Sequence, residues 1–183
     1  MKDIFLVRHG TASATWEEHP DPGLSSRGRQ EAQNLEVALS ICLDESVRLL
    51  SSPLARARET ANPLALKLNQ KVDVNDAISE IPSPVDLVDR KKWLQKFMKQ
   101  KWQDQNDEVL TWRSTAIRFV KSLPSSSVLF THFLLINAIV GEIMKVDRTL
   151  YFWPENCSIT HIRLNGFAPE LVSLGDQMQS VVN

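Results

Sequence analysis

The 183-residue chain has a formal net charge of −1, and 43% of its residues are hydrophobic and 23% charged. This balance suits one folded domain, excludes bulk disorder and argues against a protein that coats nucleic acid. The first apolar run, Ile4 to Val7, is too short for a signal peptide or a spanning helix. We therefore expect a cytoplasmic protein with a single domain over residues 1–183 and with neither nucleic-acid nor membrane partners.

Cysteine usage gives no sign of a disulfide framework or a zinc site. The two cysteines, Cys42 and Cys157, form no CxxC pair, and no His/Cys cluster has metal-ligand spacing. We expect two reduced, buried thiols, no metal and no other cofactor.

Short apolar or β-branched runs alternate along the chain with segments of helical periodicity. Ser25 or Ser26 is expected to cap the first helix, and Ser51-Ser52-Pro53 to open the second. Residues 11–26 and 81–84 are rich in helix breakers and are expected to be loops. In chain order, the pattern predicts a strand at 4–7, a helix at 26–42, a strand at 47–50, a helix at 53–68, a short strand at 72–74, helices at 86–102 and 108–121, a strand at 128–131, a helix at 133–145, and strands at 158–164 and 170–174.

This alternation predicts an α/β fold, a three-layer αβα sandwich with a mainly parallel central sheet. In such folds ligands bind beyond the carboxyl ends of the strands. Polar residues follow three expected strands at that point, namely Arg8-His9, Ser51-Ser52 and Thr131-His132. The sequence therefore predicts a site at one edge of the sheet.

The tripeptide Arg8-His9-Gly10 combines groups suited to phosphate chemistry. A guanidinium fork matches phosphate oxygens, a neutral imidazole is a nucleophile near physiological pH, and glycine lets the backbone approach an anion. Alone the tripeptide is weak evidence, because an Arg-His pair after a strand is usually an incidental surface feature. Arg56, in a first helical turn, can reach the same edge, whereas Arg58 is expected to be solvated.

Together these segments resemble branch 1 of the histidine phosphatase superfamily, also called the phosphoglycerate mutase-like family, and in particular its small bacterial-type phosphatases. The resemblance covers most of the chain, and the joint order and spacing of its motifs are specific. They are VRHGT at 7–11, LSSRGRQEA at 24–32, SSPLARA at 51–57, TH at 131–132 and NCSIT at 156–160.

The resemblance implies that His9 accepts a phosphoryl group and is then freed by water. Arg8, Arg56 and His132 would form the phosphate pocket. Their positive charge would replace the magnesium ion of other phosphoryl-transfer sites, so that no metal is required. The hydroxyl of Thr11 is a further candidate contact to phosphate.

In one branch of the family the general acid is a glutamate after the second strand–helix unit, and Glu80 stands at that place. In the other branch an acid directly follows the second histidine, where this chain has Phe133. Glu80 is therefore expected to protonate the leaving oxygen and later to activate water. The alternative is an exposed loop glutamate without a catalytic role.

Several positions depart from the family pattern. Many relatives have glycine where this chain has Phe133, whose bulk is expected to narrow the pocket or to block a backbone contact to phosphate. The proline-rich run Ile81 to Pro84 replaces the glycine-rich, acidic and aromatic run of several small-molecule phosphatases, so their substrates cannot be carried over. The order Gln30-Glu31, often reversed in relatives, is expected to be a surface variation.

Residues 81–107 are expected to include a lid or cap. Their basic stretch at 90–101 would draw in acidic substrates. The alternative is a solvated helix face with Trp93, Phe97 and Trp102 packed inward.

Three functions remain open. The first is a phosphomonoesterase acting on a phosphorylated small molecule or on a phosphoprotein, including protein phosphohistidine. The second is a cofactor-dependent mutase, against which the short connection between Leu68 and Glu80 argues, because mutases normally carry larger insertions. The third is a non-catalytic phosphate-binding module, against which the retention of His9, Arg56 and His132 argues.

Overall fold

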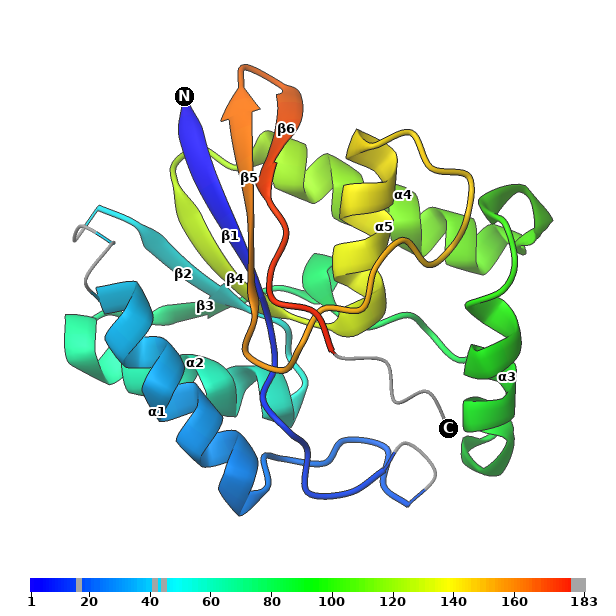
Figure 1. Ribbon diagram of the computed structural model, residues 1–183, viewed down its shortest axis with the longest axis horizontal. Coiled ribbons are helices and arrows are strands. Elements are labelled where there is room, and N and C mark those ends of the chain that lie inside the picture. Colours follow the sequence, from blue (N-terminus) through cyan, green and yellow to red (C-terminus); the bar gives the residue numbers. More distant parts are fainter. Residues whose placement is uncertain (16–17, 41–42, 44–45, 179–183) are drawn as a thin grey trace.

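The computed structural model describes residues 1–15, 18–40, 43 and 46–178. Within them six strands form one sheet in the spatial order β3-β2-β4-β1-β5-β6 (Figure 1). The pairs β3-β2, β2-β4 and β4-β1 are parallel, whereas β5 and β6 add antiparallel at one side. The strands are β1 (Lys2–Arg8), β2 (Arg48–Ser51), β3 (Val72–Val74), β4 (Ser127–Thr131), β5 (Ile159–Asn165) and β6 (Ala168–Ser173).

Helices cover both faces of this sheet, and the expected αβα sandwich is confirmed (Figure 1). The helices α1 and α2 lie on one face, and α4 and α5 lie on the other. The helices are α1 (Ser26–Ser40), α2 (Ala55–Leu68), α3 (Arg90–Phe97), α4 (Asp107–Ser122) and α5 (Phe133–Ile143), with 3-10 turns η1 (Asp76–Ile78), η2 (Leu87–Asp89) and η3 (Trp102–Asp104).

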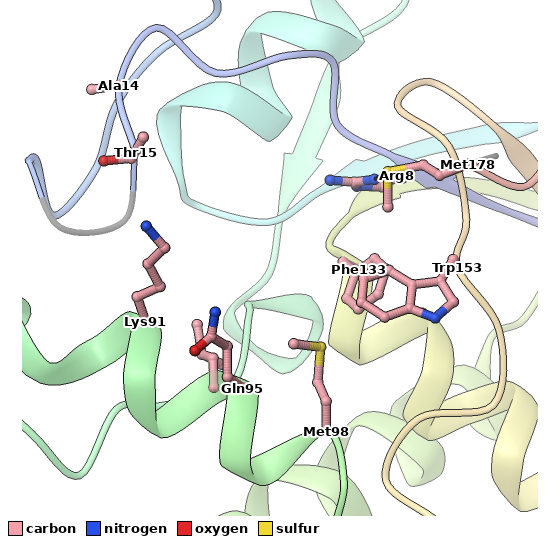
Figure 2. A pocket seen from close by; sticks show the side chains of 10 residues that line it. Arg8, Ala14, Thr15, Lys91, Gln95, Met98, Phe133, Trp153 and Met178 are labelled. Atoms are coloured by element: carbon pink, nitrogen blue, oxygen red, sulfur yellow. Dashed lines mark hydrogen bonds between the residues drawn. The ribbon is translucent and has the colours of Figure 1, made fainter. Parts of the chain in front are cut away.

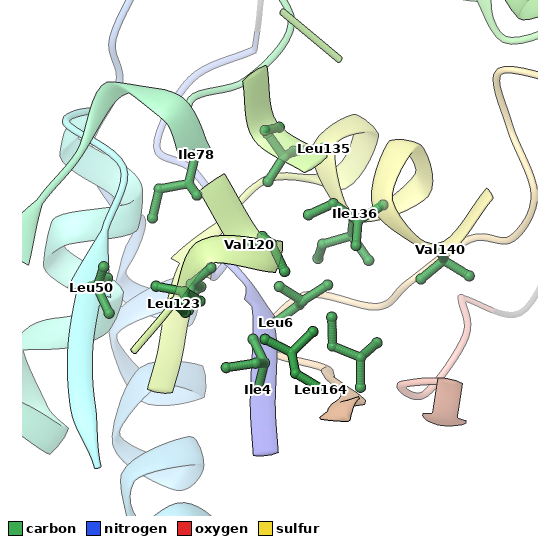
Figure 3. Packing of buried hydrophobic residues seen from close by; sticks show 14 of the residues in the cluster. Ile4, Leu6, Leu50, Ile78, Val120, Leu123, Leu135, Ile136, Val140 and Leu164 are labelled. Carbon is green, nitrogen blue, oxygen red and sulfur yellow. The ribbon is translucent and has the colours of Figure 1, made fainter. Parts of the chain in front are cut away.

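The middle residues of the central strands β1 and β4 are apolar, as expected for strands covered on both faces. Side chains alternate between faces along a strand, so neighbouring residues enter different cores. In β1, Ile4 and Leu6 pack with α4 and α5 (Figure 3), whereas Val7 joins the cluster under α1 and α2. In β2, Leu50 likewise belongs to the cluster with α4 and α5, and Leu49 belongs to the cluster under α1 and α2. This division fixes which strand ends meet at the site.

Several helix boundaries differ from the prediction. Helix α2 begins at Ala55 instead of Pro53, and its N-cap residue Leu54 makes no side-chain capping bond. Helix α3 begins at Arg90, after the turn η2, instead of at residue 86, and it ends at Phe97, short of residue 102. At this end the Phe97 carbonyl accepts the Gln100 N–H at 3.0 Å and the Thr149 hydroxyl at 2.5 Å. The predicted end of the first helix at Cys42 lies outside the described residues.

Helix α3 stands apart from the sheet, beyond α5 (Figure 1). Leu94 and Phe97 of α3 pack with Trp102 against Phe133 and Leu134 of α5. The inward packing considered for this segment is therefore present, and the segment is attached to the helix that follows the second predicted site histidine. Its role as a lid stays a prediction.

The loop after β1 is pressed against the first turn of α1. Ser25 caps α1, since its hydroxyl accepts the Gly28 N–H at 3.0 Å and donates to the Thr11 carbonyl at 3.0 Å. A Cβ atom on Gly28 would collide with the Thr11 backbone, and one on Gly10 would lie 2.8 Å from the Gly28 carbonyl oxygen. Both glycines are thus required by close approach of two backbone segments.

We expect Gly28→Ala to lower the free energy of unfolding by about 1–3 kcal/mol, because neither backbone segment can retreat without displacing the loop. Chemical denaturation measures this. The matched control is Gly141→Ala in α5, where the nearest atom to a new Cβ lies 3.9 Å away. It should be neutral or gain up to about 1 kcal/mol from helix propensity. Equal effects of the two substitutions would contradict this account.

Candidate active site

The polar residues that follow β1, β2 and β4 meet at one edge of the sheet. Arg8 is paired in register with Thr131, and the His9 N–H donates to the Thr131 carbonyl at 3.0 Å. The Ser52 N–H donates to the Phe130 carbonyl at 3.0 Å. These ladder bonds continue just past the strands and hold the following side chains on a rigid base.

The imidazole of His9 is buried and bonded at both nitrogens. Its Nδ1 lies 2.8 Å from the Gly10 carbonyl oxygen, which can only accept, so Nδ1 carries the hydrogen. The Nε of Arg56 donates to His9 Nε2 at 3.1 Å, and an arginine can only donate. Two independent contacts therefore select the tautomer with a lone pair on Nε2, the form that a nucleophile needs.

The pKa of His9 lies well below the usual histidine range. Burial is the main cause, and the charges of Arg56 and Arg8 add to it. The imidazole is thus neutral at physiological pH, in agreement with the lone pair assigned to Nε2.

Arg56 reaches His9 because it lies in the first turn of α2, directly above the end of β2. Its side chain is only 2% exposed, and Nη1 lies 3.9 Å from a carboxylate oxygen of Asp21. The same oxygen accepts the Ala55 N–H at 2.9 Å, which ties the loop at 20–23 to the start of the helix. Arg58 is exposed, as expected.

His132 is fully buried beside His9, with the two ring centroids 5.2 Å apart. Its Nε2 lies 2.7 Å from the Ser52 hydroxyl, and its Nδ1 is buried without a hydrogen-bond partner among the described residues. When Ser52 donates to Nε2, Nδ1 carries a hydrogen that can bond to an anion. Burial, and then the charge of Arg56, holds the pKa of His132 well below its usual range.

The Arg8 guanidinium is held from two sides. Its Nη1 donates to the Pro154 carbonyl at 2.7 Å and lies 3.5 Å from the sulfur of Met178, and the group sits 5.2 Å from the centroid of the Phe133 ring. Its Nε is buried and has no partner among the described residues. Unpaired buried polar atoms on both Arg8 and His132 indicate a ligand that would complete their hydrogen bonding.

Glu80 is buried, contrary to the exposed-loop alternative, with 8% of the residue exposed. Its two carboxyl oxygens face the backbone N–H groups of Ile81 at 3.0 Å and of Leu134 at 3.5 Å. Burial raises its pKa above the ordinary glutamate value, although these N–H groups and Arg56 oppose the rise. A carboxyl group with a raised pKa is suited to donate a proton.

The hydroxyl of Thr11 is engaged elsewhere than at the phosphate pocket. It donates to Glu31, which also accepts the Thr11 N–H at 2.8 Å, and it accepts a bond from the Asn156 side-chain amide at 2.9 Å. Its proposed contact to phosphate stays a prediction. The order Gln30-Glu31 was expected to be a surface variation, and for Glu31 this is wrong, because its carboxylate anchors the loop that follows His9.

The sequence reasoning missed Thr60, and it placed Ser52 at the site edge without assigning it a role. Thr60 lies one helical turn after Arg56, and its hydroxyl accepts the Gly10 N–H at 3.0 Å while donating to the Arg56 carbonyl at 2.7 Å. Ser52 orients His132. The i to i+4 spacing of Arg56 and Thr60, and the serine pair at the strand end, were available signals for both.

The remaining predicted cysteine and histidine assignments concern residues around the site. Cys157 is a free, half-buried thiol whose pKa is raised by burial to about 12, so it is a poor nucleophile. Cys42 lies outside the described residues. His161 stacks on Phe5 and lies 2.7 Å from Asp3, in keeping with the expected structural role.

A cavity of about 460 Å³ opens beside Arg8 (Figure 2). It lies between α3, the loop at 14–15 and the segment around Trp153. Phe133 forms part of its wall. The expected effect of its bulk on the phosphate pocket stays a prediction. The lining consists of Arg8, Ala14, Thr15, Lys91, Leu94, Gln95, Met98, Phe133, Trp153 and Met178.

Residues 4–177 match the model of the histidine phosphatase superfamily (branch 1). This match covers nearly the whole chain, so the protein belongs to that family, and it is a phosphatase-type enzyme. The resemblance identified from the sequence motifs is confirmed.

Solved structures with the same fold include two phosphatases. A phosphoserine phosphatase from Entamoeba histolytica, in complex with 3-phosphoglyceric acid, is 20% identical with a TM-score of 0.71, over 97% of this chain and 98% of that one. A mycobacterial glucosyl-3-phosphoglycerate phosphatase in complex with VO3 is 19% identical with a TM-score of 0.72, over 97% of this chain and 100% of that one. At these identities the likeness establishes the fold. A search of curated proteins finds no match.

Neither a metal-binding cluster nor a membrane-spanning helix is found in the described part of the chain. Across that part of the chain, no group of three or more His, Cys, Asp or Glu side chains is arranged to hold a metal ion. None of its helices combines the length and the apolar character needed to cross a bilayer.

The pKa directions predict a bell-shaped pH dependence of kcat/KM. Activity should fall at low pH as His9 becomes protonated, at a pH below the usual histidine value, and at high pH as Glu80 loses its proton, at a pH above the usual glutamate value. Glu80→Gln should remove the alkaline limb and lower kcat by about 10²–10⁴-fold on an alkyl phosphate. The loss in kcat/KM, which reports the first step, should be smaller on 4-nitrophenyl phosphate, whose leaving group needs no proton.

The exposed Glu108, in the first turn of α4, offers a matched control. Glu108→Gln should leave the pH profile unchanged. An alkaline limb that survives in Glu80→Gln would assign the general acid to another group.

Proposed function

We propose that the protein hydrolyses a phosphomonoester through a phosphohistidine intermediate on Nε2 of His9, without a metal ion. The observation that carries this proposal is the doubly fixed tautomer of His9, with Nδ1 bonded to the Gly10 carbonyl and Nε2 facing Arg56. A buried, neutral imidazole beside two arginines is suited to attack phosphorus and has few structural uses that would require such neighbours.

The phosphate pocket would consist of Arg8, Arg56 and His132. The two guanidinium groups supply positive charge where the equatorial oxygens gather negative charge in the transition state. Nδ1 of His132 and Nε of Arg8 are buried donors without partners, and phosphate oxygens would satisfy both. Arg56 would exchange its bond to His9 for one to phosphate, which frees the Nε2 lone pair.

In the first step, the Nε2 lone pair of His9 forms a bond to phosphorus as the bond from phosphorus to the ester oxygen breaks. The departing oxygen takes the proton of Glu80. The phosphorylated imidazole keeps its Nδ1 hydrogen, and the Gly10 carbonyl stabilises the positive charge that this ring then carries.

In the second step, the Glu80 carboxylate takes a proton from water while the water oxygen bonds to phosphorus. The bond between phosphorus and Nε2 breaks, and its electron pair returns to His9. Inorganic phosphate leaves, and both residues regain their starting protonation states.

Hydrolysis is favoured over mutase activity by the short connection between α2 and Glu80. Only β3 and the turn η1 lie there, and no helical insertion is present to enclose a second phosphate and exclude water. The names of the solved neighbours, both of small-molecule phosphatases, also support a phosphomonoester as substrate. A phosphoprotein substrate and a cytoplasmic location remain predictions from the sequence.

Incubation of the purified protein with phosphomonoesters in the presence of EDTA tests this proposal. We expect turnover unaffected by EDTA, an acid-labile phosphate on the protein, and a loss of at least about 10³-fold in kcat for His9→Ala. Arg58→Ala, on the solvent side of the same helix as Arg56, should keep wild-type activity. Turnover that persists in His9→Ala, or that EDTA abolishes, would disprove the mechanism.

A further inference from the structure

We infer that the cavity beside Arg8 binds the organic group of the substrate and selects esters in which that group is apolar and carries a ring. This inference rests on the proposed function and specifies the substrate class of the same site. It is carried by the composition of the cavity wall and by its continuity with the phosphate pocket.

Continuity follows from two pairs of chain neighbours. Arg8, itself a proposed phosphate contact, precedes His9 and lines the cavity, and Phe133, which also lines the cavity, follows His132. The Arg8 guanidinium joins the two spaces, because it lies over the Phe133 ring and still has a buried, unpaired Nε. An ester with its phosphate at His9 therefore has this cavity as the adjacent space for its alcohol.

The wall next to Arg8 is apolar and aromatic. The rings of Phe133 and Trp153 lie 5.3 Å apart at an interplanar angle of 53°. Met98, the residue directly after α3, extends into the cavity from another side (Figure 2). Tilted aromatic rings and a methionine sulfur pack favourably against another ring. The volume of about 460 Å³ is within the range of pockets that hold drug-sized molecules.

Most polar side chains of the lining lie at the end of the cavity away from Arg8 (Figure 2). Lys91 and Gln95 are exposed side chains on α3, and Lys91 points toward Thr15 of the opposite loop (Figure 2). Near Arg8, the indole N–H of Trp153 is the one uncharged hydrogen-bond donor among the described lining side chains. A short polyhydroxy ester would lose more hydration there than this one donor replaces, whereas a ring would bury apolar surface.

The test compares esters whose leaving groups are chemically equivalent. Propyl phosphate and 3-phenylpropyl phosphate release primary alcohols of similar acidity, so a difference in kcat/KM reports the cavity and not the chemistry. We expect the phenylpropyl ester to exceed the propyl ester by at least about tenfold in kcat/KM, and glycerol 3-phosphate to resemble the propyl ester.

Two substitutions locate the effect. Trp153→Ala removes a ring that is 45% exposed, so the fold should survive, and it should lower the ratio of the two kcat/KM values severalfold. Met98→Ala changes another part of the cavity wall and should also lower the ratio of the two kcat/KM values. It provides the test if Trp153→Ala does not fold. Phe167→Ala, on the turn between β5 and β6 and 80% exposed, should keep the wild-type ratio.

The outcomes separate this inference from the proposed function. Hydrolysis of both esters with equal kcat/KM, or a ratio unchanged in folded Trp153→Ala and Met98→Ala, would overturn the inference alone. Failure to hydrolyse any ester would overturn the proposed function and the inference with it.

Discussion

The hydrogen bond from Nε of Arg56 to Nε2 of His9 places a permanent cation against a buried imidazole, and the site depends on this contact. Protonation of His9 would bring two positive charges together in a region that excludes water, so the ring stays neutral. The Gly10 carbonyl then decides which nitrogen keeps the hydrogen. Burial and the charge of Arg56 thus keep His9 neutral, and the Gly10 carbonyl keeps its hydrogen on Nδ1. The lone pair on Nε2 then faces the place where Arg56 would hold phosphate.

The sheet makes this contact possible because its parallel strands end together. His9 and Ser52 are bonded through their N–H groups to carbonyls of β4, so two loops are fixed to the strand that leads to His132. The close approach of Gly10 and Gly28 holds the first turn of α1 against the residue that follows His9. Glu31 of the same helix fixes the loop after His9, because its carboxylate accepts the Thr11 N–H. Residues distant in the sequence hence share one rigid frame, which is what a preorganised charged site requires.

Much of this arrangement could be predicted from the sequence. Apolar runs and helical periods indicate the αβα order, and polar residues at strand ends indicate the edge where His9, Arg56 and His132 meet. The exceptions have tertiary causes. Helix α3 ends early, at a point where the Phe97 carbonyl accepts a bond from Thr149, 52 residues later in the chain. Likewise Glu31 lies on a helix with an ordinary surface pattern, and only its position against Thr11 gives it a role in the site.

The cavity beside Arg8 is the part that is least predictable from the sequence. Its walls come from α3, the loop at 14–15, α5 and the segment near Trp153, whose relative positions depend on packing between elements distant in the chain. Phe133 illustrates this: the sequence marks it as unusual, but only the fold shows that it supports the Arg8 guanidinium and pairs with Trp153.

The most direct test of the central claim is the tautomer and titration of His9 in the free protein, measured by two-dimensional ¹⁵N–¹H NMR of histidine-labelled protein, with His9→Gln to assign the signal. The account predicts a hydrogen on Nδ1, an unprotonated Nε2 and a titration midpoint well below that of an ordinary histidine. A hydrogen on Nε2, or a midpoint at or above the ordinary histidine value, would contradict it.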